Sequence, residues 1–271
     1  MRKRAVRKMR GRECVEKCRC ARGLTRQRRA DILIENAKNK GERALQARKI
    51  EPIAVIYTDF EEKFGIPRQS GRVPSLTGRI VFEKPYRNPD ALRGIEAFSH
   101  LWLLFDFSKA HRPGFCPTVR PPRLGGNERV GVFASRSPFR PNSIGLSAVR
   151  LCRIEETAQE GQVLWVAGAD LLSGTPIYDI KPYLPYADCL PEACGGYAER
   201  TQHYRLQVEA PPALLALLPA PKRDALLDCL AEDPRPSYQE DPSRIYRLSF
   251  AGFTVAFSVS DGVLTVTDIF K

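Results

Sequence analysis

From residue 50 onward, short apolar runs alternate with polar turns that are rich in glycine and proline. Apolar runs of this length, with many β-branched and aromatic residues, are typical of β-strands. A polar turn at 159–161 predicts one hairpin, and Asp261-Gly262 predicts another. The pattern predicts strands at 53–57, 78–82, 99–107, 130–134, 146–155, 162–169, 205–209, 244–250, 254–260 and 264–270.

Helical signals are fewer. Asp90 is a suitable N-cap for a short helix that ends near residue 98, and residues 213–231 have a helical pattern that two prolines interrupt. The stretch at 170–186 interleaves prolines with tyrosines, and we expect it to depart from regular structure. The series of short strands before residue 190, with almost no long helix between them, favours an antiparallel barrel or sandwich over a doubly wound sheet.

Composition divides the chain into three predicted segments. Residues 1–49 form a basic extension, residues 50–190 hold a β-barrel, and residues 191–271 form a smaller α+β domain. Gly195 and Gly196 lie at the centre of the predicted linker between the last two. We therefore expect a mainly β protein in which the barrel carries the site.

The first 48 residues carry 17 Lys and Arg against 5 Asp and Glu, whereas the remaining residues balance at 26 against 26. We expect residues 1–30 to be disordered, and a weak helical pattern covers 31–49. An organellar transit peptide is disfavoured, because this region lacks serine and contains Glu13 and Glu16. A translation start assigned too far upstream would explain the change in composition at Lys49 as well as a transit peptide would.

Several classes of protein are disfavoured by the sequence. No stretch approaches the roughly twenty apolar residues of a membrane span, and the start lacks the apolar core of a secretory signal, so we expect a cytoplasmic protein. Eight cysteines occur without a CxxC pair, which favours reduced thiols over a disulfide framework. Cys14, Cys18 and Cys20 have no fourth ligand nearby, so no metal site is expected. The chain also lacks a Walker loop, a GxGxxG motif and a nucleophile elbow.

Residues 120–147 form the most unusual stretch, because arginines are packed among prolines and glycines. Proline fixes φ and glycine permits close approach, so these loops should be stiff and shaped. Since the chain beyond residue 48 is neutral, an anion site must come from local clustering of arginines. The block suits a polyanion or a nucleotide, although any single arginine is as well explained by solvation. Its arginines are Arg120, Arg123, Arg129, Arg136 and Arg140.

Two later stretches carry further candidate chemistry. Tyr178, Tyr183 and Tyr186 stand between prolines, which predicts either a rigid stacking surface for a base or tyrosines packed on the barrel. The sequence DPRPSY at 233–238 predicts an exposed turn with an acid, an arginine and a tyrosine.

Five motifs, taken together in order, resemble the TrmO, or TsaA-like, proteins. The resemblance covers residues 50–271 and does not include residues 1–49. It implies a single-sheet β-barrel that binds S-adenosylmethionine, and a tRNA methyltransferase that methylates N6 of threonylcarbamoyladenosine at position 37. It also implies a homodimer with the cofactor pocket near the subunit interface. The motifs are FGIPRQSG, LRGIEAFSHLWLL, TVRPPRLGGNERVGVFASRSPFRPNSIGLS, SGTPIYDIKPYLPY and DPRPSY.

The resemblance also implies the positions that contact the cofactor. Among them, Arg68 and Arg136 suit the cofactor's carboxylate or a tRNA phosphate, because a guanidinium binds such groups through two parallel hydrogen bonds. Asp170 suits the cofactor's amino group or ribose hydroxyls. The implied cofactor contacts are Pro67, Arg68, Gln69, Ser108, Lys109, Arg136, Leu146, Asp170, Leu171, Leu172 and Ser173.

The same resemblance implies which residues contact the tRNA substrate. The target adenine must leave the stack of the anticodon loop, and a tyrosine is suited to hold the flipped base. A proton must leave the ureido nitrogen; the proton acceptor is not identified, and Asp179 and Asp233 are candidates. The candidate substrate contacts are Arg120, Arg123, Arg140, Tyr178, Tyr183, Arg235 and Tyr238.

Two alternatives belong to other functional classes. A non-catalytic module would bind S-adenosylmethionine or RNA on the same barrel, and binding without turnover would favour it. A structural or regulatory interaction protein would show no shift in Tm with either ligand, whereas a ligand that binds only the native state must raise Tm.

Overall fold

The computed structural model describes residues 49–121, 128–201, 203–236 and 241–271. Contacts group Ile50–Lys271 into one compact unit. The predicted disorder of residues 1–30, the predicted helix that begins at residue 31 and the three N-terminal cysteines therefore lie outside the described residues.

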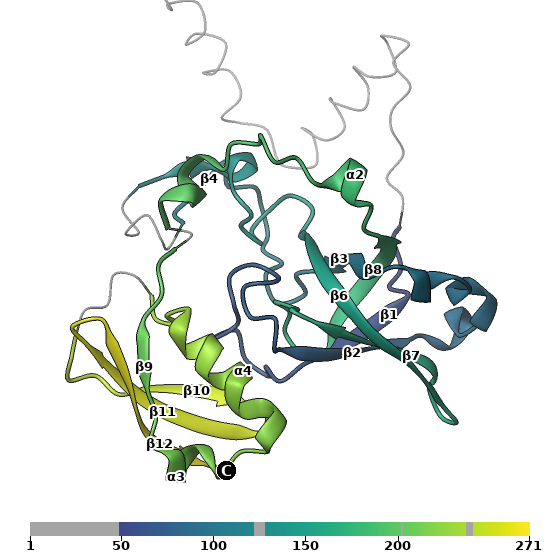
Figure 1. Cartoon of the computed structure of the whole chain (residues 1–271). Coiled ribbons are helices and arrows are strands. Elements are labelled where there is room, and N and C mark those ends of the chain that lie inside the picture. The colour runs from purple at the N-terminus through teal and green to yellow at the C-terminus, as the bar shows by residue number, and fades with distance from the viewer. Residues whose placement is uncertain (1–48, 122–127, 202, 237–240) are drawn as a thin grey trace, which may run out of the picture. The chain divides into compact units, whose positions relative to one another are not determined.

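Six strands form a closed antiparallel barrel in the order β1-β2-β7-β6-β3-β8 (Figure 1). This confirms the predicted mainly β fold and its single-sheet barrel. The hairpin predicted around 159–161 is also confirmed, because β6 pairs with β7 down to Thr157 and Gly161. The strands are β1 (Ala54–Tyr57), β2 (Thr77–Phe82), β3 (His100–Asp106), β6 (Ile144–Thr157), β7 (Gly161–Ala167) and β8 (Thr175–Pro182).

The barrel core follows from the alternation of side chains along each strand. On β3, Leu101, Leu103 and Phe105 are buried, whereas Trp102 and Leu104 between them are half-buried on the outer face. Successive residues of a strand point to opposite faces, so one apolar set fills the interior. The interior set joins residues of all six strands into one apolar cluster.

The expectation of irregular structure at 170–186 is wrong for its centre, because β8 closes the barrel between β1 and β3. Pro176 and Pro182 stand near the two ends of this strand, where the missing backbone donor costs least. Between them, residues 177 and 179–181 pair with β3. A register shift opposite Leu104 leaves Tyr178 as the extra residue of a β-bulge.

The predicted helix capped by Asp90 takes a different form. Two short 3-10 helices, Pro89–Leu92 and Ile95–Ala97, replace it. The N-cap is Asn88, whose side chain accepts a hydrogen bond from the Asp90 amide at 3.0 Å. Proline favours the first position of a helix, so Pro89 places the cap at Asn88, two residues upstream of Asp90.

The predicted strand at 130–134 is wrong beyond its first two residues. A short sheet pairs β4 (Thr118–Val119) with β5 (Val130–Gly131), and a 3-10 helix follows at Val132–Ala134. The Val132 carbonyl accepts hydrogen bonds from the Ser135 amide and hydroxyl and from Arg140 Nη1 at 3.1 Å. These donors curl the chain and end the strand.

The C-terminal strands form a second sheet in the order β10-β11-β12-β9. The turn at Asp261-Gly262 has φ values of 51° and 79°, as a tight hairpin turn requires, so the second predicted hairpin is confirmed. Pro219 is the N-cap of the longer helix, which explains the break in the helical pattern. The elements are β9 (Gln207–Glu209), α3 (Pro212–Leu215), α4 (Ala220–Ala231), β10 (Tyr246–Phe250), β11 (Phe253–Ser260) and β12 (Val263–Phe270).

The apolar core beneath this sheet includes Phe60, Val73 and Leu76, which come from the segment between β1 and β2. The predicted domain boundary near residue 190 stays a prediction. The connection from β8 contains α2 (Pro185–Asp188) and a 3-10 helix at Gly196–Thr201. In the described part of the chain, no helix is long and apolar enough to cross a membrane.

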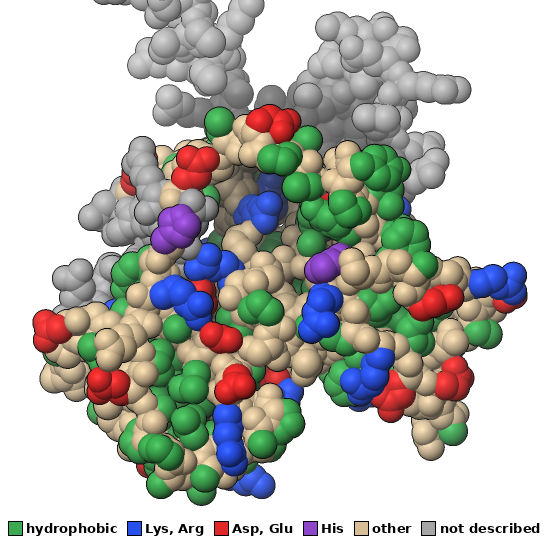
Figure 2. Space-filling model, viewed as in Figure 1, with side chains coloured by type: hydrophobic (Ala, Val, Ile, Leu, Met, Phe, Trp, Pro, Cys, Tyr) green, Lys and Arg blue, Asp and Glu red, His purple; other side chains and the backbone are tan. Residues whose placement is uncertain are grey.

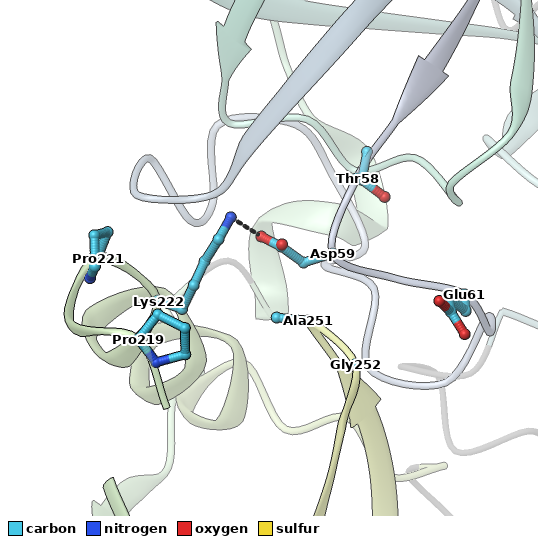
Figure 3. Close-up of a pocket in the computed structure, with 8 residues that line it drawn as sticks. All are labelled: Thr58, Asp59, Glu61, Pro219, Pro221, Lys222, Ala251 and Gly252. Carbon is cyan, nitrogen blue, oxygen red and sulfur yellow. Dashed lines mark hydrogen bonds and ion pairs between the residues drawn. The ribbon is translucent and has the colours of Figure 1, made fainter. Parts of the chain in front are cut away.

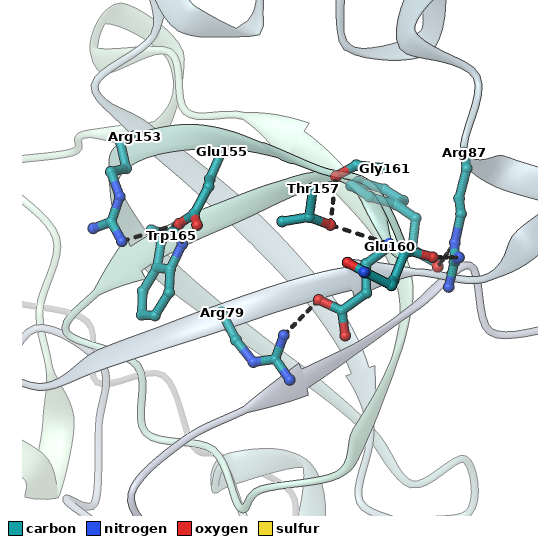
Figure 4. A network of polar contacts seen from close by, with 10 residues as sticks. Arg79, Arg87, Arg153, Glu155, Thr157, Glu160, Gly161 and Trp165 are labelled. Atoms are coloured by element: carbon teal, nitrogen blue, oxygen red, sulfur yellow. Dashed lines mark hydrogen bonds and ion pairs between the residues drawn. The ribbon is translucent and has the colours of Figure 1, made fainter.

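The outer face of β2, β7 and β6 carries a row of cross-strand polar pairs (Figure 4). Arg79 forms an ion pair with Glu160 at 2.6 Å, and the Arg153 guanidinium lies 4.2 Å from the centre of the Trp165 ring. Trp165 Nε1 donates to Glu155, which also pairs with Arg153. Positive and negative groups offset one another, so this face is not a candidate anion site. Figure 2 shows the same mixing of charges on another view of the surface.

Candidate functional site

A pocket of about 450 Å³ lies where β3 ends and β6 begins. The register explains why these ends meet, because Phe105 is opposite Gly145 and Asp106 is opposite Ile144. Gly145 is required here, since a Cβ at this position would lie 2.3 Å from the Phe105 ring. The loops at 66–69 and 135–140 and the segment after β7 complete the lining.

Ten of the eleven predicted cofactor contacts line this pocket. Their role in holding a cofactor stays a prediction. The exception is Ser173, whose hydroxyl accepts a hydrogen bond from the Thr58 amide at 3.3 Å. The residues brought together are Pro67, Arg68, Gln69, Ser108, Lys109, Arg136, Leu146, Asp170, Leu171 and Leu172.

Asp170 supplies a carboxylate to the pocket. Ser147 Oγ donates to Asp170 Oδ1 at 2.6 Å, and the Ser70 amide also interacts with the carboxylate. Burial raises the pKa of Asp170, and these hydrogen bonds and the charge of Arg136 oppose the rise. A carboxylate held in this way is suited to bind a cationic ligand group, whose charge would replace the lost solvation.

The basic side chains that line the same pocket differ in their hydrogen-bond partners. Arg136 is exposed and donates to Gln69 Oε1 at 2.5 Å, a neutral acceptor. Arg140 Nη1 donates to the carbonyls of Val132 and Ser135, so this guanidinium also shapes the loop that carries Arg136. Arg68 Nη2 donates to the carbonyl of Arg235 at 3.1 Å and thereby joins the pocket to the 233–235 turn.

A cluster at the end of β3 was not identified from the sequence pattern. Asp106 is buried, lines the pocket and lies 2.8 Å from His111 Nε2. Burial, with a further contribution from the neighbouring Asp106 charge, raises the pKa of Tyr178. The bulge on β8 places this tyrosine beside Asp106, and the signal in the sequence is an acid that ends an otherwise apolar run.

The predicted substrate contacts are only partly brought together. Arg140 lines the pocket, Arg120 is exposed outside the lining, and Tyr178 lies beside Asp106. Tyr183 packs against Trp102 with ring centres 5.5 Å apart, which matches the alternative of a tyrosine packed on the barrel. Arg123 and Tyr238 lie outside the described residues.

The predicted exposed turn at 233–238 is buried at its start. Asp233 is 9% exposed and has a φ of 51°. Its carboxylate accepts hydrogen bonds from Arg235 Nε at 2.9 Å, from Arg235 Nη2 at 3.1 Å and from the Tyr204 hydroxyl at 3.0 Å. These bonds fix Arg235, whose carbonyl meets Arg68 at the pocket.

Neither candidate proton acceptor lies in the pocket lining. Both oxygens of Asp233 accept hydrogen bonds as described above. Asp179 on β8 forms an ion pair with Lys181 at 2.8 Å and accepts a hydrogen bond from the Ile180 amide. The two carboxylates that do line the pocket belong to Asp106 and Asp170. No group of three or more His, Cys, Asp or Glu side chains that could hold a metal ion occurs among the described residues.

A second hollow of about 360 Å³ lies between the end of β1, the start of α4 and the β10–β11 turn (Figure 3). Lys222 and Asp59 point toward each other in it and form an ion pair at 2.7 Å. Lys222 Nζ also donates to Thr77 Oγ1. Lys222 and Asp59 are engaged with one another, so this hollow is a weaker candidate for a ligand site than the pocket at the end of β3.

Asp59 belongs to a segment that holds one wall of the main pocket. Thr58 Oγ1 donates to the Leu171 carbonyl at 2.9 Å and accepts from the Phe60 amide at 3.3 Å. The Ser173 amide in turn donates to the Phe60 carbonyl at 2.8 Å. These bonds fix the segment that presents Asp170 to the pocket. Ser173 therefore supports this segment from outside the pocket lining.

Comparisons with known proteins agree with one another. The family model described as tRNA-methyltransferase O N-terminal domain matches residues 55–189, and the TrmO C-terminal domain model matches residues 204–271. A relative from Escherichia coli (strain K12), named tRNA (adenine(37)-N6)-methyltransferase, is 43% identical over 79% of this chain and 94% of its own length. A Pseudomonas aeruginosa relative, named putative S-adenosylmethionine-dependent methyltransferase RcsF, is 42% identical over 73% of this chain and 86% of its own length. A crystal structure of TrmO from Pseudomonas aeruginosa superposes with a TM-score of 0.67 at 34% identity, and the match covers 83% of this chain and all of that one.

Proposed function

The chain belongs to the TrmO family, and from this premise we propose that it is an S-adenosylmethionine-dependent tRNA methyltransferase. Its target is N6 of threonylcarbamoyladenosine at position 37 of the anticodon loop, and it works in the cytoplasm, where mature tRNA is found. The observation that supports this most is the meeting of four separated segments in one pocket, with the Asp170 carboxylate close to the Arg136 guanidinium.

The residues of the pocket fit the cofactor chemically. The Asp170 carboxylate suits an ammonium group, and Arg136 suits a carboxylate, so the two side chains match the two ends of an amino acid. Leu146, Leu171 and Leu172 offer apolar contacts for the rest of the ligand. A volume of about 450 Å³ lies within the range of small-ligand sites. When bound, S-adenosylmethionine supplies a methyl group that is bonded to its sulfonium sulfur.

The chain's own contribution to the reaction is position and environment. Methyl transfer requires the acceptor nitrogen in line with the methyl carbon, and correct placement accounts for much of the rate gain. The threonine part of the substrate carries a carboxylate, which the basic residues Lys109 and Arg140 of the lining are placed to attract. With Asp170 assigned to the cofactor's ammonium group, Asp106 is the lining carboxylate that remains to receive the nitrogen's proton, directly or through water.

Replacing Thr58 by valine is expected to weaken S-adenosylmethionine binding about fivefold and to lower the free energy of unfolding by about 1–2 kcal/mol. The exchange keeps the shape of the side chain but removes the bond to the Leu171 carbonyl, so the loop that carries Asp170 loosens. Calorimetric titration and denaturant unfolding measure the two effects.

The matched control is Thr157→Val at the opposite end of the barrel. Thr157 Oγ1 also makes two backbone hydrogen bonds, to the Gly161 carbonyl and from the Glu160 amide (Figure 4). This variant should lose similar stability while binding the cofactor as wild type does. Equal cofactor affinity in both variants would show that Thr58 does not position the loop.

The homodimer is supported by the outer face of the barrel beside the pocket. Leu104 on β3 and Leu146 on β6 are cross-strand neighbours, and Ile144 and Leu146 are 38% and 53% exposed. Apolar side chains on an exposed sheet face favour burial against a second copy. Because Leu146 also lines the pocket, such an interface would lie next to the cofactor. Sedimentation equilibrium should give twice the chain mass of 30.5 kDa, and a monomer at micromolar concentration would refute the dimer.

Transfer of radiolabelled methyl from S-adenosylmethionine to tRNA tests the proposed activity. We expect label on tRNA that carries the threonylcarbamoyl group and none on tRNA that lacks it. If the cofactor binds but no label is transferred to either tRNA, the protein is a non-catalytic binding module. If neither S-adenosylmethionine nor tRNA shifts Tm, the protein has a structural or regulatory role and is neither a methyltransferase nor a binding module.

A further inference from the structure

Three phenylalanines next to the pocket are exposed to solvent. Phe133 is 72% exposed, Phe115 is 58% exposed and Phe139 is 36% exposed. The rings of Phe115 and Phe133 are stacked, with centres 6.3 Å apart and an interplanar angle of 25°. Exposed aromatic side chains that gather in one place mark a surface that is covered in the working protein.

Arginines accompany these rings. The Arg112 guanidinium lies 3.8 Å from the centre of the Phe139 ring, and the Arg140 guanidinium lies 5.9 Å from the centre of the Phe133 ring. We call Arg112, Phe115, Phe133, Phe139 and Arg140 the arginine–phenylalanine array. It alternates cations with flat apolar faces, which is the combination that binds single-stranded nucleic acid.

The array keeps its positive charge. Among the ion pairs formed by the described residues, none joins a carboxylate to Arg112 or Arg140. The hydrogen bonds of Arg140 go to backbone carbonyls, which do not neutralise it. A second copy of this chain would bring two such cationic surfaces face to face, whereas the phosphates of an RNA would complement them.

The array also lies beside the reacting centre. Arg140 belongs to both the array and the pocket lining, and Ser135 and Pro138 line the pocket between Phe133 and Phe139 in sequence. A nucleotide held in the pocket would therefore have its chain neighbours within reach of the exposed rings.

We propose that the arginine–phenylalanine array stacks unpaired bases of the anticodon loop that flank the methylated adenosine, and that its arginines contact their phosphates. The inference rests on the proposed function, because it takes tRNA as the substrate. Stacking on a ring tolerates any base, so the array contributes affinity without restricting the enzyme to one anticodon.

Replacing Phe133 by alanine tests the array in the full-length protein. Binding to an anticodon stem-loop RNA is expected to weaken about tenfold, since one stacking ring is lost. Phe133→Trp should restore binding, because it restores a flat ring. The S-adenosylmethionine affinity and the sedimentation mass of both variants should equal those of wild type. Tyr86→Ala is the control, since Tyr86 is also exposed, at 39%, but lies next to Arg87, which bonds to the hairpin at the other end of the barrel.

The outcomes separate the array from the proposed function. If wild type methylates tRNA and Phe133→Ala binds the stem-loop as tightly as wild type, the array is refuted and the function stands. If wild type methylates no tRNA, the function itself fails. If Phe133→Ala instead changes the sedimentation mass from dimer to monomer, the array is covered by a second copy of the chain, which overturns the RNA assignment.

Discussion

Arg136→Ala is expected to lower kcat/KM for methyl transfer at least about 100-fold, while the protein remains folded. Arg136 is exposed at the pocket, its hydrogen-bond partner Gln69 is neutral, and its charge acts on Asp170. Removing the guanidinium deprives an anionic ligand group of a two-bonded partner and leaves the Asp170 charge less compensated. Steady-state kinetics with tRNA and S-adenosylmethionine varied in turn would measure the loss.

Two further variants serve as controls for Arg136→Ala. Arg129→Ala removes an arginine of the same block that bonds to Thr118 Oγ1 and does not line the pocket, and it should leave kcat/KM within about twofold of wild type. Arg136→Lys keeps the charge without the planar fork and should recover only part of the activity. Activity of Arg136→Ala equal to that of Arg129→Ala would remove Arg136 from the site.

Asp170→Asn is expected to weaken S-adenosylmethionine binding about 10- to 100-fold, because a charge-assisted hydrogen bond to the ligand's ammonium is lost. The neutral side chain keeps nearly the same shape beside Ser147. Cofactor affinity of wild type should fall as pH falls through the raised pKa of Asp170, because protonation removes the carboxylate's charge. The variant should lack this dependence, and calorimetric titration across pH compares the two.

The same carboxyl group should lower stability at neutral pH. Its folded-state pKa lies above the ordinary 3.8, so the folded protein binds this proton more tightly than the unfolded chain does. This group's contribution therefore makes the free energy of unfolding decrease as pH rises from 3.8 to the raised pKa. Asp170→Asn removes this penalty, so its unfolding free energy at pH 7 should equal or exceed that of wild type. A clearly less stable variant at pH 7 would contradict this assignment of the pKa shift.

Much of the barrel is predictable from local pattern, because strands such as β3 alternate buried and half-buried residues over a complete run. The strand β8 is not, since its prolines carry a local signal for irregular structure, and only its pairing with β1 and β3 overrides that signal. The 3-10 helix at Val132–Ala134 is likewise set by tertiary hydrogen bonds from Arg140.

The candidate site is likewise only partly predictable from the sequence. The motifs predict which loops meet, and ten of the eleven residues line one pocket. The Asp106–His111 contact depends on a backbone turn after β3, and the stacking of Phe115 on Phe133 joins residues far apart in sequence. Asp233 is an acid in a polar, proline-rich turn, yet it is buried, and its carboxylate accepts three side-chain hydrogen bonds from Arg235 and Tyr204. Tyr204, which is 29 residues from Asp233 in the sequence, is a partner that no local pattern encodes.

Mass spectrometry of the nucleosides released from tRNA after incubation with the protein and S-adenosylmethionine tests the central claim most directly. The account predicts that threonylcarbamoyladenosine at position 37 is converted to its N6-methyl derivative, and that Arg136→Ala leaves it unconverted. Unchanged threonylcarbamoyladenosine with wild-type protein that binds the cofactor would contradict the account, and so would a methyl group found on any other nucleoside.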